Sequence, residues 1–278
     1  MSDGISAARY AERLLRTRAA VVEARASALL VGVGPELEWL TGYAAHGGER
    51  LNLLIIPADG DIAFVSPRLE APAARATPGF APGAIRIETW EDTDDPFLLV
   101  PALVPPRAPL GFLVSDGLRA SFVLGLQAVL PGASWEVASR VLAPLRRVKD
   151  PEEIALLRAA AQAADRAMER IITGPLVGRT EAQVARDVRE ALVEEGHDTA
   201  EFAFVASGPI CASPHHERGD RVIAGGEPLL MVIGGRRAGY NSVFTRTIWI
   251  ADDDGSAPDA DFAVIYELTA AAQAAARE

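Results

Sequence analysis

The stretch that decides the fold is VIGGRRAGYNSVFTRT, residues 232–247. Apolar and β-branched residues flank a centre that is rich in glycine, a pattern typical of two strands joined by a turn. We expect one strand over residues 228–233 and its partner over residues 240–250. Glycine accepts the backbone conformations that tight turns require, so the turn is predicted over residues 234–239.

Upstream of this hairpin, the sequence predicts two helices and one strand. DPEE at residues 150–153 is a helix start, because Asp150 can cap, proline suits the first helical position and Glu153 can reach back as in a capping box. That helix is predicted to run to about residue 172. Thr180 and Gln183 form a second capping box, and a strand is expected over residues 201–206.

The region before residue 142 alternates strands and helices. An amphipathic helix is predicted over residues 10–23, and a hairpin signal lies at Asp59-Gly60. Further strands are expected over residues 28–31, 51–56, 62–65, 85–89 and 110–114, with helices near 96–103 and 120–130. The pattern predicts an α/β domain over residues 1–142 and a second domain over residues 148–278.

Composition excludes several classes of protein. Of the 278 residues, 49% are hydrophobic and 23% are charged, which is typical of a globular chain. The net charge is -11 and the basic residues are spread thinly, so we expect no nucleic-acid partner. We also expect no membrane partner and a cytoplasmic location, since the chain has neither a long apolar run nor a signal peptide. Cys211 is the single cysteine, which excludes an internal disulfide framework.

Several stretches, taken in order, carry a family resemblance: EWLTGY at 38–43, RRVKDPEEI at 146–154, ASGPICASPHHERGDR at 206–221, and the hairpin at 232–247. Together they resemble the peptidase M24 family, the pita-bread metallopeptidases that include Xaa-Pro aminopeptidases, prolidases and creatinases. The resemblance implies a creatinase-type N-terminal α/β domain followed by the first half of a pita-bread α+β domain. The family's second domain is longer than residues 148–278, so the chain is expected to be a truncated form.

The resemblance also implies a metal centre that this sequence does not support. The family binds Mn, Co or Zn through two hairpin aspartates, with a histidine and two glutamates that would follow residue 278. The aspartate positions correspond to Val232 and Val243, and valine has no donor atom. We therefore expect no metal cofactor. Apolar side chains are stabilising when buried, so we also expect both valines to lie in the core.

Three residues are candidates for ligand contacts. His215 matches the family's substrate-facing histidine and is the candidate catalytic and substrate-binding residue. Arg246 could bind a carboxylate or form a structural ion pair, and His46 lies in a loop that in relatives can reach a partner's active site. His216 is expected to be a loop residue. A serine hydrolase pair of Ser207 with His215 lacks a nucleophile elbow around the serine.

Three functions remain open from the sequence. The first is an M24 protein without metal-dependent hydrolase activity, either a pseudoenzyme or a truncated form. The second is an active Xaa-Pro dipeptidase or aminopeptidase. The third is a non-catalytic module that binds a peptide, a small amide or a protein in the cleft. Because half of a curved sheet exposes an edge and an apolar face, we expect a homodimer or a partner that supplies the missing half.

Overall fold

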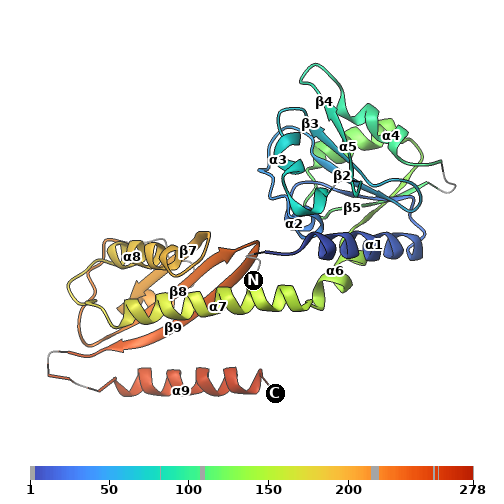
Figure 1. Ribbon diagram of the computed structural model, residues 1–278. Coiled ribbons are helices and arrows are strands. Elements are labelled where there is room, and N and C mark those ends of the chain that lie inside the picture. Colours follow the sequence, from blue (N-terminus) through green and yellow to red (C-terminus); the bar gives the residue numbers. More distant parts are fainter. Residues whose placement is uncertain are drawn as a thin grey trace. The chain divides into compact units, whose positions relative to one another are not determined.

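The computed structural model describes residues 4–81, 83–106, 110–213, 219–252, 254–255 and 257–277. The chain forms two compact units, Met1–Glu153 and Ile154–Glu278, which are coloured blue to green and yellow to red in Figure 1. The limits 1–142 and 148–278 drawn from the sequence stay a prediction.

The first unit is built on a six-stranded mixed sheet with the order β4-β3-β2-β1-β5-β6. Strands β1, β2 and β3 pair antiparallel, and the other neighbours pair parallel. The strands are β1 (Ala28–Val31), β2 (Leu53–Pro57), β3 (Ala63–Pro67), β4 (Arg86–Trp90), β5 (Gly111–Val114) and β6 (Ser134–Val137). The helices are α1 (Ala7–Glu23), α2 (Pro35–Thr41), α3 (Ala71–Arg75), η1 (Pro78–Phe80), η2 (Pro96–Leu99), α4 (Val100–Leu103), α5 (Ala120–Val129) and α6 (Ser139–Arg147).

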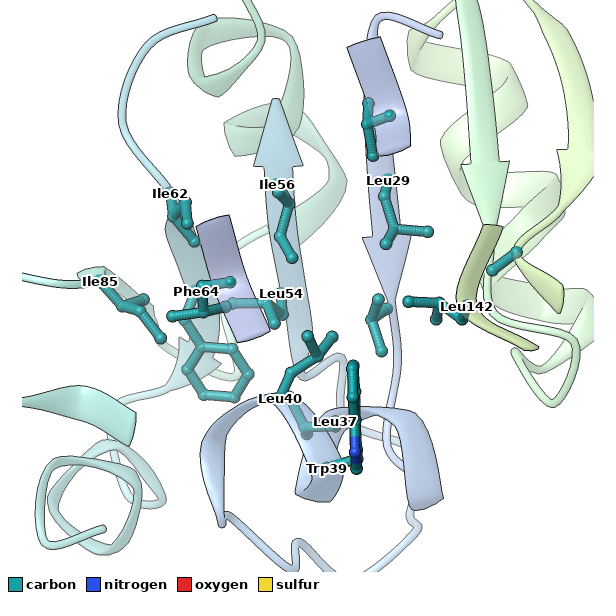
Figure 2. Packing of buried hydrophobic residues seen from close by; sticks show 14 of the residues in the cluster. Leu29, Leu37, Trp39, Leu40, Leu54, Ile56, Ile62, Phe64, Ile85 and Leu142 are labelled. Carbon is teal, nitrogen blue, oxygen red and sulfur yellow. The ribbon is translucent and has the colours of Figure 1, made fainter. Parts of the chain in front are cut away.

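Both faces of this sheet are buried along its inner strands β1, β2 and β3. Successive residues of β2 alternate between two apolar clusters, with Leu54 and Ile56 in one and Leu53 and Ile55 in the other. In the first cluster, side chains of α2 lie beside those of β2 and β3, as Figure 2 shows for Leu40 and its neighbours. Burial on both faces explains why β1 and β2 are nearly continuous apolar runs, unlike the edge strands β4 and β6.

A buried arginine connects α1 to the start of α7 (Pro151–Ile172). Arg13 is only 2% exposed, and its guanidinium lies 3.0 Å from the carboxylate of Asp150 and donates to the carbonyl of Trp39 at 2.9 Å. Asp150 and Glu153 exchange hydrogen bonds between side chain and backbone amide, at 2.8 and 2.9 Å. The predicted capping box at this helix start is confirmed.

The second unit packs helices against a three-stranded antiparallel sheet with the order β7-β8-β9. Its further elements are α8 (Glu181–Glu194), β7 (Thr199–Ser207), η3 (Gly208–Ala212), β8 (Glu227–Arg237), β9 (Tyr240–Ile250) and α9 (Ala260–Ala275). Met168 of α7 and Val188 of α8 share one apolar cluster with Met231 and Ile233 of β8. The capping box of Thr180 and Gln183 is confirmed.

The predicted turn over residues 234–239 is wrong in extent. Strand β8 continues to Arg237, and the turn consists of Ala238 and Gly239, whose φ angles are 46° and 85°. Positive φ angles at both central residues are typical of a two-residue hairpin turn of type I′. Gly234 and Gly235 are instead strand residues against which aromatic rings lie. A Cβ on Gly235 would meet the ring of His197 at 2.4 Å.

Helix α9 follows a polar segment after the hairpin and has no buried residue. Asp259 caps it by accepting a hydrogen bond from the amide of Phe262 at 2.7 Å. The ring of Phe262 lies 5.1 Å from that of Trp249, which ties the start of the helix to β9. Across the residues that the structure describes, no helix combines the length and the apolar character needed to cross a bilayer.

Candidate functional site on the hairpin

The two valines at the family's aspartate positions lie on one face of the β8–β9 hairpin. Val232 is directly opposite Thr245, and Val243 is directly opposite Gly234. Directly opposite residues point to the same face, and side chains alternate along each strand. Val232 and Val243 are therefore diagonal neighbours on a shared face.

This face points away from α7 and α8. Met231 and Ile233, which alternate with Val232, are fully buried on the opposite face, in the cluster with the two helices. Val243 is 68% exposed and Val232 is half-buried. The expectation that both valines lie in the core is wrong: Val243 is exposed and Val232 is only half-buried, because the helices cover the other face of the sheet.

The residues of this face do not fit a divalent metal pair. Mn, Co and Zn require carboxylate, imidazole or thiolate donors. On β8 and β9, which are described in full, the residues of this face are Pro228, Leu230, Val232, Gly234, Arg236, Asn241, Val243, Thr245, Thr247 and Trp249. They include no such donor, and the guanidinium of Arg236 would repel a cation. Over the described ranges as a whole, no group of three or more His, Cys, Asp and Glu could hold a metal.

Arg246 lies on the opposite face from the valines. It is directly opposite Met231, its guanidinium lies 3.7 Å from the centre of the Phe244 ring, and it donates to the carbonyl of Thr245 at 2.9 Å. Arg246 lies three residues after Val243 on the same strand. Because side chains alternate between the two faces of a strand, residues an odd number apart point to opposite faces. The side chain is exposed and forms no ion pair with a described residue.

The predicted histidines are not brought to this hairpin by any described contact. His46 is exposed and belongs to the first unit, between α2 and β2, whereas Arg246 belongs to the second. His215 and His216 lie outside the described residues. The roles predicted for His46, His215 and Arg246 stay predictions.

A buried polar network beside the hairpin was missed by sequence reasoning. Glu181, at the first position of α8, accepts hydrogen bonds from the amide and the hydroxyl of Ser207, at 2.7 and 2.8 Å. The guanidinium of Arg221 donates to the same hydroxyl at 2.9 Å and forms two hydrogen bonds with Glu227, which raise the pKa of Arg221. Nothing in the spacing of these four residues along the chain indicates that they meet.

The network also bears on two possible nucleophiles. Ser207 is fully buried, and its hydroxyl proton is held by Glu181, so this serine is not placed to attack a substrate. The thiol of Cys211 lies 3.2 Å from the carbonyl of Ala206, and burial raises the pKa of the thiol. A protonated thiol is a poor nucleophile, so these contacts do not support a nucleophilic role for Cys211.

Comparison with known proteins relates each unit to a described family. Residues 13–148 match the Creatinase/Prolidase N-terminal domain, and residues 155–278 match Metallopeptidase family M24. The chain is 40% identical over 270 residues to the "Probable dipeptidase PepE" of Mycobacterium tuberculosis, covering 97% of this chain and 70% of that protein. It is 28% identical over 237 residues to an uncharacterized peptidase of Staphylococcus aureus, covering 85% of this chain and 65% of that protein.

Solved structures show the same fold. The dipeptidase PepE from Mycobacterium ulcerans superposes with a TM-score of 0.86 at 37% identity, covering 95% of this chain and 69% of that one. A prolidase from Thermococcus sibiricus gives a TM-score of 0.84 at 27% identity, covering 96% and 71%. The predicted α/β architecture, a creatinase-type N-terminal domain followed by an M24 domain of the pita-bread fold, is confirmed. This chain belongs to the M24 family of metallopeptidases.

Proposed function

We propose that this chain is a non-catalytic M24 protein, which binds a ligand on the exposed hairpin face without metal-dependent hydrolysis. The observation that carries the proposal is the pair of valines, Val232 and Val243, on one face of the hairpin. Metal-assisted hydrolysis needs a metal held by fixed donor atoms, because the metal polarises the scissile carbonyl and activates a water. Side chains without donor atoms at both positions do not support that chemistry.

The exposed face offers apolar surface to a ligand. Phe202 lies across Gly234 from Val243 on this face, and the two side chains are 38% and 68% exposed. Val232 and Leu230, further along β8 on the same face, are half-buried. We expect a peptide or a small amide to place an apolar side chain there, which removes apolar surface from water. We also propose a cytoplasmic protein that acts as a homodimer or with a partner chain. The net charge of -11 argues against nucleic acid.

A second candidate function is dipeptide hydrolysis. The 40% identity with the probable dipeptidase PepE favours it, since that similarity extends over 97% of this chain. On this alternative, hydrolysis would proceed without the two hairpin carboxylates. The two candidates make opposite predictions about bound metal and turnover.

The discriminating experiment combines metal analysis with peptide hydrolysis. The purified chain is analysed for manganese, cobalt and zinc by mass spectrometry, and Ala-Pro and Ala-Pro-Ala hydrolysis is followed with added manganese. We expect neither stoichiometric metal nor turnover. Stoichiometric metal together with metal-dependent turnover would establish the dipeptidase alternative.

A double variant tests whether the valines are responsible. Val232→Asp with Val243→Asp places two carboxylates on the exposed face, and we expect it to bind manganese more tightly than the wild type in a titration. The matched control is Val193→Asp with Val222→Asp, which adds the same charge at positions that are 48% and 52% exposed. Equal manganese affinity of the two double variants would contradict the assignment of the hairpin positions.

A further inference from the structure

A cavity of about 630 Å³ lies in the first unit, between α1 and the segments that lead into β3 and β4. Small-molecule sites typically enclose about 300–1,000 Å³ and combine apolar walls with a few polar groups. Leu14, Ile62 and Ile85 line the cavity and belong to the buried core, so its floor is fixed. Leu15 lines the same cavity and is 66% exposed, so apolar surface remains available to a ligand.

The cavity also holds an arginine that differs from the other arginines of its helix. Arg9, Arg13 and Arg16 of α1 each form an ion pair with an acidic residue. Arg18 forms none with any described residue, which sets it apart. Its Nε atom is buried without a hydrogen-bond partner, as that of Arg9 also is. Arg18 therefore has no anionic partner, and an anionic group in the cavity would form charge-assisted hydrogen bonds with the terminal amino groups of its guanidinium.

An acidic residue lines the same cavity. Asp61 is exposed and has no hydrogen bond or ion pair with the described part of the chain. It therefore does not neutralise Arg18. The remaining charged residue of the lining, Arg86, is already paired with Glu88. The cavity thus presents one available cation and one available anion beside an apolar floor.

We infer that this cavity binds a small apolar zwitterion, that is, a free amino acid or a dipeptide with an apolar side chain. The ligand's carboxylate would accept hydrogen bonds from Arg18, and its ammonium group would donate to Asp61. Its side chain would cover Leu14 and Leu15. A planar guanidinium matches a carboxylate with two parallel hydrogen bonds, which gives Arg18 the main recognition role. The site goes beyond the proposed function, because it uses no residue of the hairpin.

Calorimetric titration of the full chain with leucine and with Leu-Leu, in buffer with EDTA, tests the proposal. We expect at least one of the two to bind, and its N-acetyl and C-terminal amide derivatives to bind about ten-fold or more weakly, because each lacks one charge. Arg18→Gln should abolish the discrimination against the amide, and Asp61→Asn should abolish the discrimination against the acetyl derivative. Arg16→Gln, on the same helix at a position outside the cavity lining, is the matched control and should leave binding unchanged.

Methyl NMR spectra locate the bound ligand. We expect shift changes at Leu14, Leu15, Ile62 and Ile85, and their loss in Ala11→Phe, which fills the cavity from an exposed helix position. Thermal melts establish that each variant is folded. Absence of binding by both leucine and Leu-Leu, or binding that Arg18→Gln leaves unchanged, would overturn the inference. Shift changes confined to the second unit would overturn it as well.

Discussion

Replacing Arg13 with methionine should destabilise the first unit by about 3–5 kcal/mol, the usual cost of removing one partner from a buried ion pair. Arg13 is 2% exposed and Glu153 is 4% exposed, with 3.4 Å between the guanidinium and that carboxylate. Asp150, at 3.0 Å from the guanidinium, is 12% exposed. The variant leaves these two carboxylates without their buried cation and also removes a hydrogen bond to the carbonyl of Trp39. The loss is a large fraction of the roughly 5–15 kcal/mol that stabilises a domain.

The assay is urea unfolding followed by tryptophan fluorescence. Trp39 is a suitable reporter, because the guanidinium of Arg13 lies 5.0 Å from its ring and its Nε1 donates to Glu153 at 3.1 Å. Arg16→Met is the control, since Arg16 is 48% exposed and 3.9 Å from Glu12, and such surface pairs contribute about 0–1 kcal/mol. The reasoning is refuted if Arg13→Met unfolds within about 1 kcal/mol of the wild type.

Three other perturbations test separate parts of the structure. Gly235→Ala should lower the free energy of unfolding in urea by about 1–3 kcal/mol, because the new Cβ would overlap the ring of the buried His197. In Gly234→Ala the new Cβ meets a partly exposed ring, so the loss of stability should be smaller. Equal losses in the two variants would contradict this account. Burial acts to raise the pKa of Asp150, yet a backbone amide donor and nearby arginines lower this pKa overall in the folded protein. The ionised carboxylate therefore stabilises the fold above about pH 4, and this stabilisation is lost as the pH falls through the lowered pKa of the folded state. The free energy of unfolding of Asp150→Asn should therefore fall less steeply with pH below about pH 4 than that of the wild type, as acid titrations would show. The same slope in both proteins would argue against this role of Asp150. Ala238→Asn should raise the melting temperature, because a φ of 46° destabilises alanine by about 1–2 kcal/mol and asparagine tolerates this conformation better. An unchanged or lower melting temperature would speak against strain at this turn.

The elements predicted best from the sequence are those fixed by local chemistry. The helix starts at Asp150 and Thr180 were predicted correctly, because a capping box is formed by residues within one turn. The extent of β8 could not be predicted in this way. Gly234 and Gly235 suggest a turn when read alone, and only the rings of Phe202 and His197 explain why glycine is needed inside the strand.

The candidate site also has features that the sequence predicts and features that only the structure shows. The sequence placed Val232 and Val243 on the two strands of one hairpin, and the strand register adds that they share a face. Their exposure depends on which face the helices cover, and that is decided by the packing of α7 and α8 rather than by the hairpin sequence. The contact of Glu181 with Ser207 joins residues 26 positions apart, at 2.7 Å, and has no local signature.

The two faces of the hairpin in the second unit differ in how far their side chains can be changed. The row containing Met231 and Ile233 is held by packing, so substitutions there are limited by shape and volume. The row containing Val232 and Val243 faces outward, and Val243 in particular can be exchanged with little effect on the core. The strand pair is therefore a natural scaffold for directed evolution: a library confined to the outward row would sample new binding surfaces while the folded framework beneath them is kept.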